Sequence, residues 1–309
     1  MKNLLLLLAL MCIITTSCEE SENGNIDTPI ECGDNEILYT TKYGYPIELN
    51  ITDGFGGNLM SNTYENGYGR IIFDDDVICI PERAFKDCTS ITTINLPNSL
   101  SAIGGSAFSG CDSLTSITIP DSVTSIGDSA FGGCDSLTSI TIPDSVTSIG
   151  DYAFYRCTSL TSITIPDSVT SIGDSAFSGC DSLTSVTIGN GVTSIGDYAF
   201  YDCTSLTSVT IGNGVTSIDD YAFYDCTSLT SITISDNVSS IGHSTFKDCT
   251  SLIAVYCKST TPPSGGRDIF SNNASGRKIY VPRNSLDAYK SAIFWREYAN
   301  AIIGYDFEK

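Results

Sequence analysis

Eight cysteines recur at a constant interval of 23 residues. They are Cys88, Cys111, Cys134, Cys157, Cys180, Cys203, Cys226 and Cys249. Thiols can form disulfides, bind metals or act as nucleophiles. If the period reflects stacked coils about 4.8 Å apart, the side chains point in parallel and do not suit the ~3.8 Å Cβ separation of a disulfide. We therefore expect buried free thiols that act as small hydrophobic groups. Outside this series, Cys32 with Cys79 is the one pair that we consider for a disulfide.

Carboxylates recur with the same period at two positions. The first set follows a proline at Asp121, Asp144 and Asp167; the second comprises Asp128, Asp151, Asp174, Asp197 and Asp220. Two carboxylates ~5 Å apart repel by ~0.8 kcal/mol in water and by ~3 kcal/mol at an effective dielectric of 20. They must therefore face water, accept hydrogen bonds from backbone amides or bind cations. Capping and turn formation explain both positions without an ion, so we predict no metal site and no cofactor.

The residues do not indicate an enzyme. The one histidine, His243, stands where other repeats carry the aspartate of the second set, and a surface substitution explains it. No HExxH, phosphate-cradling glycine-rich loop or GxSxG motif is present. Catalysis needs different groups that converge, whereas a repeat presents the same group many times.

Tyrosine breaks the uniformity of the repeats. Three pairs occur: Tyr152 with Tyr155, Tyr198 with Tyr201, and Tyr221 with Tyr224. On a helical turn, residues three apart share one face. The last two pairs fall on adjacent repeats, which predicts an exposed patch of four tyrosines, and tyrosine is a preferred anchor of protein interfaces. The alternative, that the rings only lie flat on the outer wall, stays open.

The elements that position these side chains follow from one repeat. The segment "LTSITI" alternates like a short strand, and Pro120 and Asp121 supply a turn. Ala130, Phe131 and Cys134 have helical spacing after a possible cap at Asp128. Each repeat is thus predicted to be a strand, a turn and a short helical turn. One repeat cannot bury enough apolar surface alone, so the repeats must stack.

The pattern LxxIxIPxxVxxIGxxAFxxC over residues 77–257 resembles the BspA-like subclass of leucine-rich repeats, the type-5 bacterial form. The resemblance implies an α/β repeat solenoid, a right-handed superhelix with a parallel sheet on the concave face and short helical turns. It also implies a surface-exposed bacterial protein concerned with adhesion or host contact.

An open stack needs covers at both ends. We assign residues 30–76 to an N-terminal lead-in and cap, 77–257 to the solenoid and 258–309 to a C-terminal cap. Within the last segment, we expect a strand at 278–281 and a helix from near Ser285. The aromatic residues Tyr289, Trp295 and Tyr298, with Ile293, should pack as a lid.

The N-terminal sequence predicts that the protein is exported. Residues 1–17 form a signal peptide with an apolar core, and the small residues before Cys18 resemble the lipobox of bacterial lipoproteins, although Thr15 replaces its usual aliphatic residue. We expect cleavage before Cys18 and a lipid on its thiol. An ordinary signal peptide cut nearby is the alternative. Residues 18–29 form a flexible acidic tether that resembles the surface-export signal of Bacteroidetes-type lipoproteins, which implies lipid anchoring at the outer face of the outer membrane.

Charge and architecture together define the expected function. The net charge of -21 disfavours nucleic acid and anionic lipid as partners. We predict a non-enzymatic cell-surface binding or adhesion protein whose partner is a host extracellular protein or a glycan. The alternative is a structural component of the cell envelope without a specific ligand.

Overall fold

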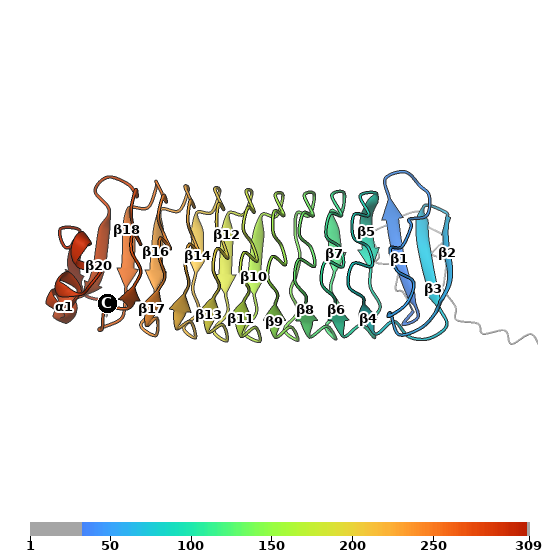
Figure 1. Ribbon diagram of the computed structural model, residues 1–309, viewed down its shortest axis with the longest axis horizontal. Coiled ribbons are helices and arrows are strands. Elements are labelled where there is room, and N and C mark those ends of the chain that lie inside the picture. The colour runs from blue at the N-terminus through green and yellow to red at the C-terminus, as the bar shows by residue number, and fades with distance from the viewer. Residues whose placement is uncertain (1–32, 308–309) are drawn as a thin grey trace, which may run out of the picture. The chain divides into compact units, whose positions relative to one another are not determined.

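Each 23-residue repeat forms one coil, and the coils stack in chain order (Figure 1). The computed structural model describes residues 33–307. The predicted signal peptide, Cys18, the tether and Cys32 lie outside the described residues. Within residues 33–307, no helix is long and apolar enough to cross a membrane.

The segment "LTSITI" and its equivalents form a column of parallel strands, as predicted. These are β5 (Ile91–Asn95), β7 (Ser116–Thr118), β10 (Ser162–Ile165), β12 (Ser185–Ile188), β14 (Ser208–Thr210), β16 (Ser231–Ile234) and β18 (Ala254–Cys257). The register repeats the sequence period, with Ile163 opposite Val186. Isoleucine and valine face the core while serine and threonine face out. Residues 138–141 are not regular strand, but Thr138 still donates its N–H to the Thr115 carbonyl at 3.3 Å.

A second column of short parallel strands was not predicted. It is a nine-stranded sheet built mostly from the Ser-Ile pair of each repeat. Its members are β4 (Cys79–Ile80), β6 (Ala102–Ile103), β8 (Ser125–Ile126), β9 (Ser148–Ile149), β11 (Ser171–Ile172), β13 (Ser194–Ile195), β15 (Ser217–Ile218), β17 (Ser240–Ile241) and β19 (Ser264–Gly265). Each coil therefore hydrogen-bonds to its neighbours along two strand columns.

The predicted helical turn is wrong, because this segment is a run of tight non-helical turns. Gly132 donates its N–H to the Ser129 carbonyl, and Cys134 donates to the Phe131 carbonyl, at 3.0 and 3.1 Å. The alternate amides reach the next coil instead, as Phe131 does to the Ala153 carbonyl at 2.8 Å. Ser129 adopts a positive φ of 54°, which an α-helix excludes. The turns thus add a third column of hydrogen bonds between coils.

A ladder of phenylalanines fills the core between these columns. It consists of Phe85, Phe108, Phe131, Phe154, Phe177, Phe200, Phe223, Phe246 and Phe270. Neighbouring ring centroids are 5.1–5.7 Å apart and the planes differ by at most 8°. Identical rings at one position allow every coil to pack on the next in the same way.

The N-terminal cap is a small antiparallel sheet. It comprises β1 (Glu36–Thr41), β2 (Leu59–Glu65) and β3 (Tyr68–Phe73), and β1 pairs antiparallel with β5 of the first coil. Phe55 packs edge-on against Phe85 with ring centroids 6.3 Å apart. The cap thus covers both the strand edge and the phenylalanine ladder.

The C-terminal cap extends the strand column and then closes it. Its elements are β20 (Lys278–Pro282), η1 (Arg283–Ser285), α1 (Leu286–Ser291), η2 (Arg296–Tyr298) and β21 (Ile302–Tyr305). Tyr289 and Trp295 are fully buried, and the Trp295 Nε1–H donates to the Pro263 carbonyl at 2.8 Å. The lid is present, but Ile293 does not belong to it because its side chain is 65% exposed.

Candidate binding surface

Four tyrosines on two adjacent coils stack into one continuous surface. We call Tyr198, Tyr201, Tyr221 and Tyr224 the tyrosine plate. The rings of Tyr198 and Tyr221 stack with centroids 4.8 Å apart, and those of Tyr201 and Tyr224 with centroids 5.1 Å apart. Within a coil, the two rings are tilted, at 5.7 and 5.8 Å. Both pairs therefore meet, as predicted from their adjacent repeats.

The backbone turn, not a helix, brings each pair together. Tyr198 and Tyr221 have φ values of 57° and 58°. Tyr201 then donates its N–H to the Tyr198 carbonyl at 3.0 Å, which closes the turn. Serine occupies the same left-handed position in other coils, for example Ser175 at 55°. The tyrosine side chains therefore replace serine on the outside of the coil without a change in the backbone conformation.

The plate has acidic neighbours. A hydrogen bond to Asp248 is the largest cause that raises the pKa of Tyr224 to about 12, followed by burial. Burial, and then the charge of Asp225, raises the pKa of Asp202. The Tyr224 hydroxyl stays protonated at neutral pH and remains a hydrogen-bond donor.

The third pair lies apart from the plate. The rings of Tyr152 and Tyr155 meet edge to face with centroids 5.7 Å apart. The intervening coil has small residues at the equivalent positions, Ser175 and Ser178, and both are buried. The structure therefore joins four of the six candidate tyrosines and leaves Tyr152 and Tyr155 as a separate wall.

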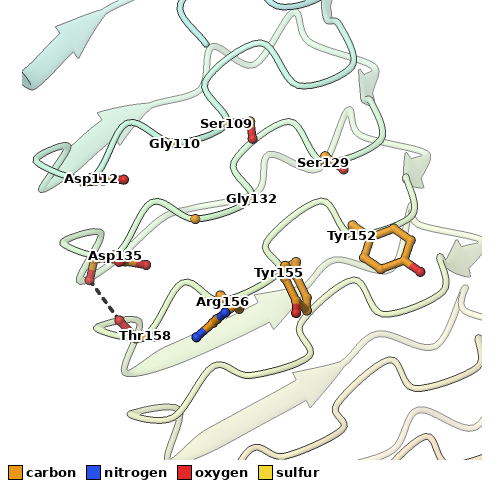
Figure 2. Close-up of a pocket in the computed structure, with 11 residues that line it drawn as sticks. Ser109, Gly110, Asp112, Ser129, Gly132, Asp135, Tyr152, Tyr155, Arg156 and Thr158 are labelled. Atoms are coloured by element: carbon orange, nitrogen blue, oxygen red, sulfur yellow. Dashed lines mark hydrogen bonds between the residues drawn. The ribbon is translucent and has the colours of Figure 1, made fainter. Parts of the chain in front are cut away.

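That wall borders a hollow on its N-terminal side (Figure 2). We call this cavity of about 510 Å³ the two-coil hollow. Its lining residues are Ser109, Gly110, Asp112, Ser129, Gly132, Gly133, Asp135, Tyr152, Tyr155, Arg156 and Thr158. Serine or glycine replaces tyrosine at these positions on two successive coils, and the sequence pattern alone does not indicate that two such coils form a cavity.

The cysteines form a column of free thiols, as predicted, but Cys88 at the N-terminal end of the column is only half-buried. Cys111 through Cys249 are fully buried, and each Sγ–H donates to the carbonyl of a phenylalanine on the preceding coil. Burial raises the pKa of Cys157, as does the neighbouring Cys134 to a smaller extent. These thiols are structural groups and not nucleophiles. Cys79 is also free.

The aspartate column is held by backbone amides of the following coil. Asp128 Oδ1 accepts the N–H of Asp151 at 3.0 Å, and the same bond repeats up the column. His243 continues it, because its N–H binds Asp220 and its Nδ1 accepts the N–H of Arg267 at 2.8 Å. No cluster of three or more metal-ligating side chains is found in the part of the chain that the structure describes.

A second cluster of stacked tyrosines, near the C-terminal cap, was not predicted from the sequence. The outward column that carries threonine on earlier coils continues through Thr233 into Tyr256 and Tyr280. Their rings stack at 4.8 Å, and Tyr305 meets both edge to face. The signal was present as a change from threonine to tyrosine at one repeat position, but the 23-residue spacing ends after Cys257.

Comparison with known proteins places this architecture in a family. BspA type leucine rich repeat regions, in six copies, match residues 64–184 and 170–299. The chain belongs to the BspA-type leucine-rich repeat family. The resemblance inferred from the repeat pattern is thereby confirmed. No curated protein matches the chain significantly.

Two solved structures support the assignment of this BspA-type protein. A leucine-rich repeat protein from Bacteroides ovatus ATCC 8483 is 30% identical, with a TM-score of 0.54 over 76% of this chain and 70% of that one. The T. pallidum leucine rich repeat protein is 33% identical, with a TM-score of 0.50 over 56% of this chain and 82% of that one. The family and these structures are leucine-rich repeat proteins, a class used for binding or structural roles.

Proposed function

We propose that this BspA-type protein is a non-enzymatic binding protein of the bacterial surface, and that the tyrosine plate contacts its macromolecular partner. The partner is a host extracellular protein or a glycan. The predicted signal peptide and lipidated Cys18 support anchoring in the outer membrane with the solenoid exposed. The observation that carries the proposal is the stacking of four tyrosines on two coils of an otherwise serine- and glycine-rich flank.

The physical argument rests on how tyrosine binds. A tyrosine ring offers a large contact area and a hydroxyl while only two side-chain torsions need to be ordered. Stacking already restrains the four rings before a partner arrives, which reduces the entropy lost on association. Tyr198 is 40% exposed, whereas the other three rings are half-buried, so Tyr198 is the most accessible member of the plate.

The test replaces the plate and leaves the coil intact. We expect Y198S/Y201S/Y221S/Y224S to weaken adhesion to host-matrix proteins at least tenfold. Serine occupies the two equivalent positions of a neighbouring coil, Ser175 and Ser178, so circular dichroism and melting should stay close to wild type.

The matched control is Y43S/Y45S. Tyr43 and Tyr45 are likewise stacked, at 5.6 Å, and both are exposed, but they belong to the N-terminal cap. This variant should adhere like wild type. If the four-serine variant adheres equally well, the plate is not the contact surface. If the wild-type chain also binds no glycan, a structural envelope role becomes the better explanation.

A further inference from the structure

The two-coil hollow exists because two consecutive coils lack the side chains that build the adjacent wall. Ser129 and Gly132 occupy the positions that Tyr152 and Tyr155 occupy on the next coil. The coil before them has serine at both positions. The first tyrosine pair therefore stands at the end of a depression two coils wide, with the Tyr152 side chain 46% exposed.

The lining combines three kinds of group (Figure 2). Asp112 and Asp135 lie along one side and offer carboxylate acceptors. Arg156, Tyr155 and Tyr152 follow one another along the adjoining coil, with Arg156 nearest Asp135, so that a cationic donor and aromatic faces adjoin. Burial, then the charge of Asp112, raises the pKa of Asp135, while Arg156 lowers it. Both signs of charge thus act within one cavity.

We propose that the two-coil hollow binds a short neutral oligosaccharide. A sugar hydroxyl donates and accepts hydrogen bonds, so it can use the carboxylates of Asp112 and Asp135 as well as the guanidinium of Arg156. The apolar C–H face of a pyranose ring matches the exposed ring of Tyr152. The cavity volume of about 510 Å³ lies within the ~300–1,000 Å³ of small-ligand sites.

Charged ligands fit the hollow less well. A sulfated or carboxylated glycan meets Asp112 and Asp135 inside and a net charge of -21 outside. A basic side chain meets Arg156 beside the aromatic rings. A ligand that carries many hydroxyls and no charge avoids both conflicts.

The test fills the hollow with side chains that the coil already accepts. Ser129 has a φ of 54°, and Tyr152 occupies the equivalent position at 56°. A Cβ at Gly132 would have its nearest neighbours at 3.5 Å, an ordinary contact. S129Y/G132Y should therefore fold like wild type, which melting checks. The control S175Y/S178Y adds the same pair between Tyr155 and Tyr201, outside the hollow.

The assay is binding of the chain from residue 30 to an array of neutral oligosaccharides, followed by calorimetry with the best tetrasaccharide. We expect wild type and S175Y/S178Y to bind, and S129Y/G132Y to bind at least tenfold more weakly. No binding by wild type, or equal binding by S129Y/G132Y, overturns the proposal. Binding of polylysine that S129Y/G132Y removes would assign the hollow to a basic peptide instead.

This inference rests on the proposed binding function but uses different residues. The variant Y198S/Y201S/Y221S/Y224S should keep oligosaccharide binding. If the plate variant adheres like wild type, the proposal for the hollow is unaffected. If the hollow binds no oligosaccharide, the proposal for the plate is unaffected.

Discussion

The cysteine column shows how one residue type serves a solenoid. The Cys157 side chain is small enough to pack beside the phenylalanine ladder, and its Sγ–H donates to the Phe131 carbonyl at 3.2 Å. That carbonyl also accepts the N–H of Cys134 at 3.1 Å. The thiol thus adds a weak bond to a carbonyl that is already paired, and its main contribution is apolar burial.

This packing predicts which thiols react. In native protein at pH 8, iodoacetamide should label Cys79 and Cys88 slowly and leave Cys111 through Cys249 unlabelled, because only the first two are partly exposed. Burial, with a smaller effect of Asp87, raises the pKa of Cys88 to about 11, so little of it is thiolate. Mass spectrometry of the alkylated peptides measures the pattern.

Guanidinium chloride supplies the control, since unfolding should make every thiol reactive. Native labelling of Cys157 at the denatured rate would contradict the buried column. Protection of the column thiols that persists in denaturant would instead indicate disulfides.

At the scale of the element, the strand could be predicted and the turn could not. The alternation of apolar and polar residues in "LTSITI" predicts a strand, and β10 and β12 are strands. The spacing of Ala130, Phe131 and Cys134 is compatible both with a helix and with successive tight turns. What decides between them is the bond from the Phe131 amide to the Ala153 carbonyl on the next coil, a long-range contact that spacing within one repeat cannot reveal.

The same reasoning explains what could be predicted of the candidate site. Adjacent repeats place Tyr198 beside Tyr221, so the period alone predicts the plate. The two-coil hollow depends on absent side chains at Ser129 and Gly132, and a cavity is visible only once the surrounding walls are positioned. The two-residue strands such as β8 were missed because a Ser-Ile pair is too short to show alternation.

Asp219 provides a test at the turn that follows these short strands. Coils from Gly104 to Gly242 otherwise have glycine there, and a Cβ at Gly150 would lie 2.7 Å from the backbone nitrogen of Asp128. Asp219 is half-buried, and burial, followed by the charge of Asp197, raises its pKa. A carboxyl with a raised folded pKa contributes stability that is present below its unfolded pKa of ~3.9 and is lost as pH rises through the folded value.

D219N should therefore stabilise the protein at pH 7, by about 0.5–2 kcal/mol, and the gain should vanish near pH 3. Thermal melts of both proteins across this pH range measure it. D128N is the matched control, because Asp128 is exposed and its amide replacement keeps an acceptor for the Asp151 N–H. A gain for D219N that is the same at both pH values would show that charge is not its cause.

At the scale of the whole described unit, stability is a sum over neighbours. Each coil contacts the coils before and after it through two strand columns, the turn bonds and the phenylalanine ladder. Damage at one end should then remain local, because distant coils share no contact with it. The caps matter for the same reason, since each end coil has one neighbour fewer.

Trp295 offers the sharpest test of this locality. Its fully buried ring contacts Phe270, the last ring of the ladder, with centroids 5.9 Å apart. W295A should lower the stability of the C-terminal end by about 3–5 kcal/mol. Hydrogen exchange should show amides of β18 and β20 losing protection while those of β6 and β8 retain it.

The control I293A lies two residues away on the same cap, and its exposed side chain should change stability by no more than ~0.5 kcal/mol. Equal loss of protection in β6 and β18 on W295A would mean that the coils unfold as one cooperative block. The cap would then stabilise all coils alike, and neighbour contacts alone would not account for the stability of the stack.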